Sequence, residues 1–373
     1  MTTTMGIIFA NIYDSSLGEL TNKRTMASLP YGGRYRQIDF SLSNMTNSGI
    51  RHIGIITKHN YQSLMNHIGS GQEWDLDLEE GGLEFLTPFA ADHNSSYRGK
   101  LDALNSAMSF LVHSKEDYIV LVDSGVLCAI DFRELVEHHI ASGADVTVVV
   151  KDGISNGNKQ LDMAVKVDAE NRVTDIAVDY CADESYLASM GIFAISRERL
   201  IREVTEAVAH NRYRFERDLV MHGFAEEGLR VNAYRFQGVA LFNESTAEFY
   251  RNSLALIDPE IRHGLFNRPN CTIYTKVRDE VPAYYGEFSE IDDCIVADGC
   301  TLEGSASHSV LFRGVKLGKN AVVRDSIIMQ GTVIGEGAEL ECVILDKDVI
   351  VRPGSVLRGT KDHPLVLKRG EIV

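Results

Sequence analysis

The segment "LFRGVKLGKNAVVRDSIIMQGTVIGEGAEL", residues 311–340, carries aliphatic residues at every sixth position, with glycines close by. This period is typical of a hexapeptide parallel β-helix, in which each hexad supplies one short strand and its aliphatic residue points into a narrow stacked core. The alternative is an ordinary β-rich domain with coincidental spacing, but the glycines follow the same phase as the aliphatic residues. Three inward-pointing series are predicted: Leu311, Leu317 and Val323; Ile328, Ile334 and Leu340; and Ile344, Ile350 and Val356.

The chain before residue 258 differs, because short apolar runs there alternate with segments of helical periodicity. Such alternation predicts βαβ units and a mostly parallel, Rossmann-like sheet covered by helices on both faces. Prolines 259, 269 and 282 indicate a connector at 258–282 between a first domain, 1–257, and the β-helix domain, 283–373. The expected strands span 6–10, 52–57, 118–122, 144–150, 163–167 and 191–195, and the expected helices 36–48, 102–112, 132–142, 200–211 and 246–256.

Composition narrows the class of protein. A chain of 373 residues exceeds what one hydrophobic core usually supports, so two domains are expected. The net charge of -16 argues against binding to nucleic acid or to an anionic membrane. The six cysteines form no CxxC pair, and no segment resembles an export signal or a membrane span. We therefore expect a cytoplasmic protein without nucleic-acid or membrane partners.

The segment "LPYGGRYRQIDFSLSNMTNSGI", residues 29–50, contains the most specific motif of the first domain. Pro30, Tyr31 and the two glycines after them form a turn whose glycines permit close backbone approach. Arg34 and Arg36 follow two residues apart. From chemistry alone, these two arginines either hold a phosphate or are solvated surface charges.

This motif resembles the corresponding segment of glucose-1-phosphate adenylyltransferases. The stretches "GSGQEWDLD" (69–77), "YRGKLDAL" (97–104) and "SMGIF" (189–193) are similar to further signatures of that family in the same order. The resemblance covers nearly the whole chain and implies a nucleotidyltransferase domain followed by a left-handed parallel β-helix. Catalytic members transfer an adenylyl group from ATP to glucose 1-phosphate with Mg²⁺. That chemistry needs a glycine loop, a basic residue at the phosphates and two metal carboxylates.

Several positions that this resemblance marks as catalytic carry other residues. The loop has lost the glycines that let phosphate approach, its basic residue is a serine, and the metal carboxylates correspond to a glycine and an amide. The sugar-phosphate lysine has no counterpart in "DIAVDYCADESY" (175–186), which is acidic instead. The degenerate positions are Asn11, Ile12, Asp14 and Ser16 in the loop and Gly125 and Asn243 at the metal; the retained ones are Gly99 on the nucleotide side and Ser189, Met190 and Gly191 on the sugar side.

The loss of catalytic residues, together with the retention of the scaffold motifs, favours a regulatory, catalytically deficient subunit. The chain resembles the D-type subunit that accompanies a catalytic C-type subunit in bacterial glycogen synthesis. The resemblance implies a hetero-oligomer, a tetramer by analogy with catalytic members. It also implies no cofactor for this chain alone and Mg²⁺ in the catalytic partner.

Basic residues near the first turn indicate a second kind of site. Lys23 and Arg24 correspond to family positions near the allosteric effector site, and Arg34 and Arg36 are close in sequence. A phosphorylated metabolite such as fructose 1,6-bisphosphate or phosphoenolpyruvate is the expected ligand, with ordinary surface charge as the alternative. Both Lys23 and Arg24 are expected to be exposed.

Two other functions stay open on the sequence. An active sugar nucleotidyltransferase would use the displaced carboxylates of Asp123 and Glu244 as metal ligands. An acyltransferase-like activity rests only on the hexapeptide repeat, and it would need His308, within the repeats, or His363, just after them, as a base.

Overall fold

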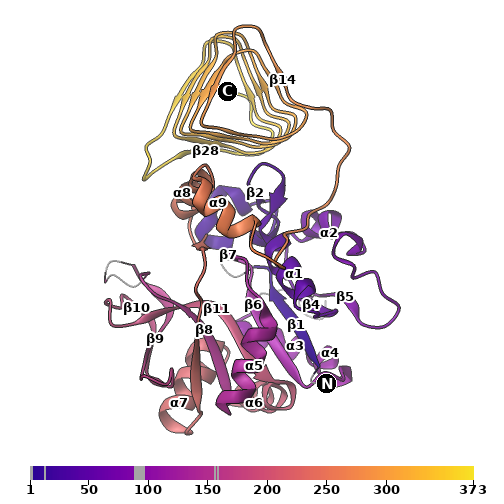
Figure 1. Ribbon diagram of the computed structural model, residues 1–373, viewed down its shortest axis with the longest axis vertical. Helices are drawn as coiled ribbons and strands as arrows, with labels where there is room; N and C mark the ends of the chain where they lie inside the picture. Colours follow the sequence, from indigo (N-terminus) through magenta and orange to yellow (C-terminus); the bar gives the residue numbers. More distant parts are fainter. Residues whose placement is uncertain (1–2, 12–13, 88–96, 155–156, 158) are drawn as a thin grey trace.

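The computed structural model describes residues 3–11, 14–87, 97–154, 157 and 159–373, and it contains an α/β domain and a β-helix of triangular cross-section (Figure 1). Strand β1 (Thr4–Phe9) lies inside the α/β sheet, where it pairs in parallel with β4 (His52–Ile56) and β6 (Tyr118–Asp123), and β4 pairs in parallel with β5 (Gly82–Leu86). The predicted parallel sheet is thereby confirmed. Its main path runs β10 (Val173–Tyr180), β9 (Leu161–Val167), β11 (Leu187–Ser196), β6 (Tyr118–Asp123), β1 (Thr4–Phe9), β4 (His52–Ile56) and β5 (Gly82–Leu86).

An antiparallel part, which alternation of strands and helices does not predict, extends this sheet on one side. Strand β11 runs antiparallel to β6, to β9 and to β8 (Val146–Lys151). Asp123 at the end of β6 consequently lies beside Gly191 in β11, at the edge where β1 and β6 end. Two further strands complete the sheet, β8 (Val146–Lys151) and β12 (Val231–Arg235), which pair in parallel.

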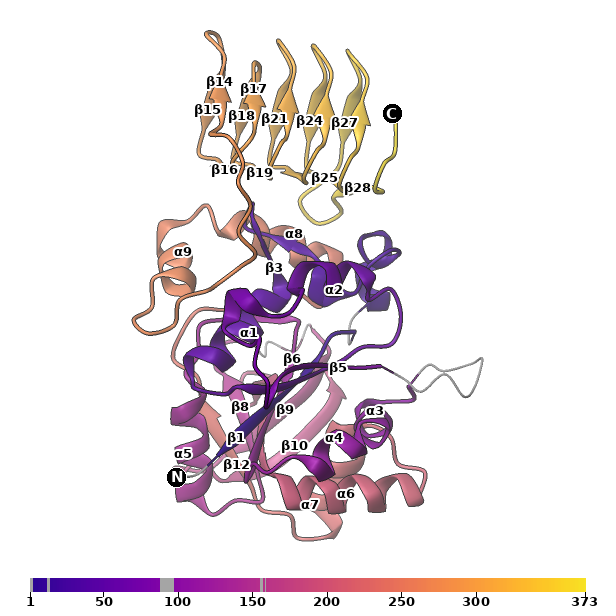
Figure 2. The same ribbon diagram turned by 90° about the vertical axis from the view of Figure 1, so that its right-hand side faces the viewer.

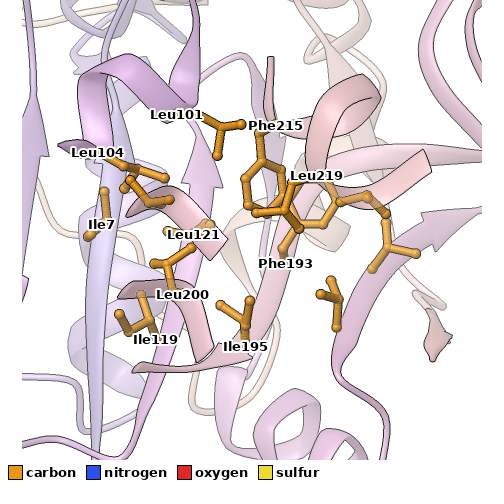
Figure 3. Close-up of a cluster of buried hydrophobic side chains, with 14 of the residues drawn as sticks. Ile7, Leu101, Leu104, Ile119, Leu121, Phe193, Ile195, Leu200, Phe215 and Leu219 are labelled. Carbon is orange, nitrogen blue, oxygen red and sulfur yellow. The ribbon is translucent and has the colours of Figure 1, made fainter. Parts of the chain in front are cut away.

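Helices cover both faces of the sheet (Figure 2). Figure 3 shows the core on one face, where Leu101, Leu200 and Leu219 pack over strand residues such as Leu121. The expected helix 102–112 is divided at Ala107 into α3 (Lys100–Ser106) and α4 (Met108–His113). In the described part of the chain, none of the helices has the length and hydrophobicity that a bilayer crossing requires. One face carries α3 (Lys100–Ser106), α4 (Met108–His113), α6 (Arg197–Ala209), the π-helical segment η4 (Phe215–Met221) and α7 (His222–Glu226); the other carries α1 (Gln37–Asn47), α2 (Gln62–Ile68) and α5 (Phe132–Ser142).

The C-terminal domain is the predicted β-helix, with three parallel sheets of five short strands each. Leu311 pairs with Ile328 and Ile328 with Leu345, so each of these coils advances 17 residues. The three sheets consist of β14 (Tyr284–Tyr285), β17 (Thr301–Leu302), β20 (Lys316–Leu317), β23 (Val333–Ile334) and β26 (Ile350–Val351); β15 (Glu290–Asp292), β18 (Ser305–Ser307), β21 (Val322–Arg324), β24 (Glu339–Glu341) and β27 (Val356–Arg358); and β16 (Ile295–Val296), β19 (Val310–Leu311), β22 (Ile327–Ile328), β25 (Val343–Leu345) and β28 (Leu365–Leu367).

The third predicted series of inward residues is wrong by one position. Ile350 and Val356 are exposed, whereas Leu345 and Val351 are buried in the β-helix core and Leu357 packs against it. Ile344 is buried too, but it faces outward against the first domain. The sheet of β19, β22 and β25 is apolar on both faces because the first domain covers its outside, so periodicity alone does not distinguish its two faces there.

The segment expected to be a connector contains a helix, α9 (Pro259–Phe266), directly after α8 (Thr246–Ala255). Proline is tolerated in the first helical turn, where its missing N–H would have no intrahelical partner, and Asp258 caps this helix. Both helices lie between the domains in Figure 1. Side chains there form a shared hydrophobic core that includes Phe40, Tyr250, Phe312 and Met329. The two domains are therefore packed on each other.

Short elements near this junction complete the fold. The turn 29–36 forms a small hairpin, and the segments that precede it are helical turns. A second hairpin-like pair joins residues far apart in sequence, next to the carboxyl end of β6. These elements are β2 (Pro30–Tyr31) with β3 (Tyr35–Arg36), β7 (Val126–Cys128) with β13 (Ala240–Phe242), η1 (Asp14–Thr21), η2 (Met26–Ser28) and η3 (Gln72–Trp74).

Candidate functional site

A small cavity lies where β1 and β6 end, the edge at which open α/β sheets bind ligands. We call it the sheet-end pocket. Its volume is about 10 Å³, which is room for about one water molecule. Its lining comprises Asp123, Val126, Leu161, Asp162, Met163, Ser189, Met190, Gly191, Glu216, Phe242 and Glu244.

A buried lysine reaches the acidic residues of this pocket. The Lys100 ammonium donates to Asp123 Oδ2 over 2.6 Å and also contacts Glu216 Oε1. Burial by itself lowers the pKa of Lys100, but the two carboxylates raise it above its ordinary value, so the ammonium stays charged. Burial also raises the pKa of Asp123, with Lys100 opposing and Glu216 adding to that effect. This triad is not predictable from the sequence, where its only signal is a lysine directly after Gly99 in a nucleotide-side motif.

A second lysine bridges Glu244, which lines the pocket, and Glu248. Lys159 Nζ lies 2.6 Å from Glu244 and 2.6 Å from Glu248. Burial raises the pKa of Glu244, and Lys159 opposes that rise. Asp123 and Glu244, the displaced carboxylates that an active enzyme would use, are thus each paired with an internal ammonium group. Carboxylates still outnumber lysines here, so the pocket is unfavourable for a triphosphate.

The loop that corresponds to the glycine-rich loop is held by its own side chains. Asp14 accepts hydrogen bonds from Asn11 Nδ2 and, over 2.7 Å, from the backbone N–H of Met26. Asn11 is buried and accepts from Thr57 Oγ1 over 2.8 Å. Ser16 is exposed. Ile12 lies outside the described residues.

The two positions marked as lost metal ligands, Gly125 and Asn243, lie side by side. The backbone N–H of Asn243 donates to the carbonyl of Gly125 over 2.9 Å, beside the β7–β13 pair. The Asn243 side chain is fully buried and its Oδ1 accepts from Asn252. The carboxylate that lines the cavity on this segment is the next residue, Glu244. Among the described residues, no group of three His, Cys, Asp or Glu is placed to hold a metal ion.

The residues retained on the sugar and nucleotide sides have structural contacts. Ser189, Met190 and Gly191 line the pocket, and Ser189 Oγ accepts from the backbone N–H of Gly191 over 3.1 Å. Gly191 adopts a φ of 64°, and an added Cβ would collide with Asp123. At Gly99 an added Cβ would collide with the carbonyl of Tyr213. Glycine is therefore required at both positions by close packing.

Basic side chains from both domains meet at the junction, and we call them the junction cluster. Arg34 and Arg36 from the β2–β3 hairpin line the same crevice as basic side chains that the sequence does not connect with them. Arg36 is also bonded within the first domain, where its Nη1 donates to the carbonyl of Ser63 over 2.7 Å. The missed residues come from three distant segments, so no local sequence signal connects them. The junction cluster comprises Arg24, Arg34, Arg36, Lys276, Arg278, Arg313 and Lys347.

The expectation that Lys23 and Arg24 are both exposed is correct only for Lys23. Arg24 is 4% exposed, and its Nη2 donates to both oxygens of Asp346 over 2.5 Å. This pair joins the first domain to the β-helix. Arg24 is buried because the two domains pack together at this position, which the local sequence does not reveal.

The junction cluster holds more positive charge than its neighbours neutralise. Burial lowers the pKa of Arg36 to about 10, and Arg24 and Arg278 contribute in the same direction. Burial, together with Arg36 and Arg24, lowers the pKa of Lys347 to about 7, although Asp346 opposes this shift. Mutual repulsion of this kind is relieved by a bound anion.

The histidines of the β-helix have no catalytic surroundings in the described structure. His308 occupies a turn, with its Nδ1 2.6 Å from Asp325 Oδ1. His363 is exposed. Neither residue lines the sheet-end pocket or the crevice at the junction cluster.

The α/β sheet with a pocket at its carboxyl edge, joined to a hexapeptide β-helix, defines a two-domain nucleotidyltransferase-like protein. Residues 6–231 match the nucleotidyl transferase family, and residues 281–362 match the family described as GlmU-like, C-terminal hexapeptide. The chain is 33% identical to the glycogen biosynthesis protein GlgD of Bacillus subtilis, over 98% of this chain and 96% of that protein. It is 30% identical to glucose-1-phosphate adenylyltransferases of Bacillus mycoides and Bacillus cereus, over 96% of this chain and 95% of each. The chain belongs to the glucose-1-phosphate adenylyltransferase family.

Proposed function

We propose that this chain is a regulatory subunit of glucose-1-phosphate adenylyltransferase in glycogen synthesis, with little or no turnover of its own. One observation carries the proposal: carboxylates that line the sheet-end pocket are paired with lysines, whereas the junction cluster keeps an excess of cations. The names of the relatives, a glycogen biosynthesis protein and several adenylyltransferases, support the pathway.

The residues that line the sheet-end pocket or lie next to it do not fit a resident Mg²⁺. Magnesium is held in proteins through carboxylate oxygens and waters. Gly125 has no side chain, Asn243 supplies only an amide, and the carboxylates of Asp123 and Glu244 are paired with lysines. In this proposal the metal and the adenylyl transfer therefore belong to the catalytic partner.

The junction cluster fits an anionic effector with several negative charges. Arg36 and Lys347 are half-buried and Arg313 is buried, while Arg34 and Arg278 are exposed at the rim. Guanidinium groups bind phosphate oxygens in a bidentate manner, and lysine adds a point charge. A phosphorylated metabolite that spans the buried and exposed cations would bridge the two domains.

Anion binding at the junction cluster should strengthen as the pH falls from 8 to 6. With a pKa of about 7, Lys347 is mostly neutral at pH 8 and mostly charged at pH 6. A bound anion favours the charged form, so binding takes up a proton and weakens above the free pKa. Sulfate is the suitable probe because it does not titrate in this range. Isothermal titration should give a dissociation constant about tenfold lower at pH 6 than at pH 8.

The matched control is Lys347→Arg, whose guanidinium stays charged throughout. This variant should bind sulfate with a nearly flat pH profile. A flat profile in the unmodified chain would remove Lys347 from the site.

The first coil of the β-helix offers a surface for a partner subunit. Strands β14 and β15 end their sheets, so one edge of each lies open in the described structure. Phe288 is 83% exposed and Val281 70% exposed beside them, and Tyr284 and Tyr285 are exposed as well. Exposed apolar side chains at an open strand edge are typical of interaction surfaces. We assign this surface to contact with the catalytic-type subunit.

Coexpression with a tagged catalytic-type subunit should yield a mixed oligomer, and Phe288→Ser should reduce its yield several-fold. The reason is that a polar residue removes apolar area from the centre of the proposed contact. Val356→Ser, at an exposed position in the last coils, is the matched control and should leave the yield unchanged. Size-exclusion chromatography with activity assays measures both assembly and effector response. Failure to co-purify at any salt or effector concentration would contradict the regulatory proposal.

A further inference from the structure

We infer that Lys347 is a modification site at which carbon dioxide binds covalently and reversibly, as a carbamate held by arginines of the junction cluster. The electron pair of the neutral amine forms a bond to the carbon of CO₂, and one C=O electron pair moves onto oxygen. The nitrogen then releases one proton to solvent, so the product carries one negative charge. The inference goes beyond the proposed function, because it concerns the isolated chain and needs no partner subunit.

The Lys347 amine is not used by the surrounding structure. Lys347 is half-buried in the turn between β25 and β26, and among the described residues its Nζ has no hydrogen-bond or ion-pair partner. The adjacent carboxylate, Asp346, is already bonded, because it accepts from Arg24 Nη2 and, over 2.6 Å, from the backbone N–H of Lys347. With a pKa of about 7, which burial and then Arg36 and Arg24 lower, the amine is mostly neutral at pH 8. A desolvated neutral lysine is a nucleophile.

The crevice beside this amine has the size and the charge that a carbamate requires. Its volume is about 30 Å³, room for about two water molecules, and the carboxylate of a carbamate has three atoms. The charged and titratable groups around Lys347 are the rest of the junction cluster, Tyr35, His67, Asp346 and Arg369. Cations predominate among these groups, so one new negative charge reduces their mutual repulsion.

Two buried guanidinium nitrogens of the junction cluster lack an acceptor. Arg24 Nη1 and Arg313 Nε are buried, and neither has a hydrogen-bond partner in the part of the chain that the structure describes. These two side chains are only 4% and 6% exposed, and the nearest carboxylate to Arg313 Nε, that of Asp298, lies 3.5 Å away. Buried donors without partners are costly, and guanidinium groups bind carboxylates strongly. The cluster therefore offers donors for the oxygens of a carbamate on Lys347.

The test is ¹³C NMR of the full chain at pH 8 with ¹³C-labelled bicarbonate, which is in equilibrium with dissolved CO₂. A carbamate resonance should appear with the unmodified chain and be absent with Lys347→Arg. This control keeps the positive charge but has no neutral amine at this position, and it keeps the α-amino group, whose own carbamate would appear in both spectra. Trapping of the carbamate as its ethyl ester, followed by peptide mass spectrometry, should place it on Lys347. If no resonance depends on Lys347 at saturating bicarbonate, the inference is wrong.

Two further variants test whether the arginines hold the carbamate. Arg313→Met should reduce its occupancy several-fold, and Arg34→Gln, at the exposed rim, should reduce it less. Because Arg313 is buried, circular dichroism must show that its variant is folded; Arg34→Gln decides the test if it is not. Occupancy equal to that of the unmodified chain in every folded variant would mean that the amine reacts without the junction cluster, which contradicts the inference.

Sulfate binding separates a covalent carbamate from bicarbonate held as an ordinary anion. Bicarbonate should weaken sulfate binding to the unmodified chain at pH 8 at least about threefold more than it weakens binding to Lys347→Arg, since a carbamate adds negative charge to the site. Equal weakening in both chains, without a carbamate resonance, would mean that bicarbonate only competes as an ion. Failure to assemble with a catalytic-type subunit would instead count against the proposed function, so the two failures are distinguishable.

Discussion

The isolated chain should form ADP-glucose from ATP and glucose 1-phosphate at least about 10³-fold more slowly than a catalytic glucose-1-phosphate adenylyltransferase assayed beside it with Mg²⁺. Loss of one preorganised charge-stabilising group costs about 10²–10³ in rate. Here Asn11 and Asp14 of the loop are hydrogen-bonded to each other, and an exposed serine, Ser16, stands where the family has a basic residue. The displaced carboxylates are paired with lysines. Because effects within one site are not additive, only the severe combined deficit is predicted. The measurement is a coupled assay for released diphosphate.

Single reversions should restore little of this activity. Gly125→Asp would add a carboxylate beside Asn243, but Lys100 and Lys159 would still neutralise the neighbouring acids. Turnover at an ordinary rate by a preparation proven free of catalytic subunit would contradict the proposed function. It would instead favour the active enzyme that uses Asp123 and Glu244.

The β-helix was predictable because its core is built by stacking similar coils along one axis. Leu311, Leu317 and Val323 recur with a fixed period, since each coil repeats the same inward positions. The prediction was wrong at Ile344, where the outer face of the same sheet is also apolar. A hydrophobic period reports burial but not which of two buried faces a residue occupies.

The functional regions were less predictable, because they depend on contacts between distant segments. Arg34 and Arg36 are recognisable from their motif, but Arg313 and Lys347 join them only when the β-helix packs on the first domain. Lys100 and Glu216 likewise meet only after α3 and η4 are brought together over the sheet. Position-by-position comparison with a family identifies what has been lost, whereas such new pairs become visible only in three dimensions.

Arg24→Ala should lower the free energy of unfolding by about 3–5 kcal/mol, the cost of removing one partner from a buried ion pair. The change would leave Asp346, which is 2% exposed, as an uncompensated charge between the domains. Lys23→Ala is the matched control: Lys23 is the exposed neighbour, and its removal should change stability by no more than about 0.5 kcal/mol. Urea unfolding followed by tryptophan fluorescence and circular dichroism measures both, and the two probes test whether the domains still unfold together.

The double variant Arg24→Met/Asp346→Leu distinguishes a lost charge pair from a general disturbance of the junction. Replacement of both partners by apolar residues removes the uncompensated charge, so most of the lost stability should return. A loss below about 1 kcal/mol in Arg24→Ala would mean that Asp346 finds other partners or water at the junction. The predicted larger loss would assign Arg24 to holding the domains together, because its Nη2 already donates to both carboxylate oxygens of Asp346. Arg34, Arg36, Arg278, Arg313 and Lys347 would then remain as the cations of the junction cluster available to an effector.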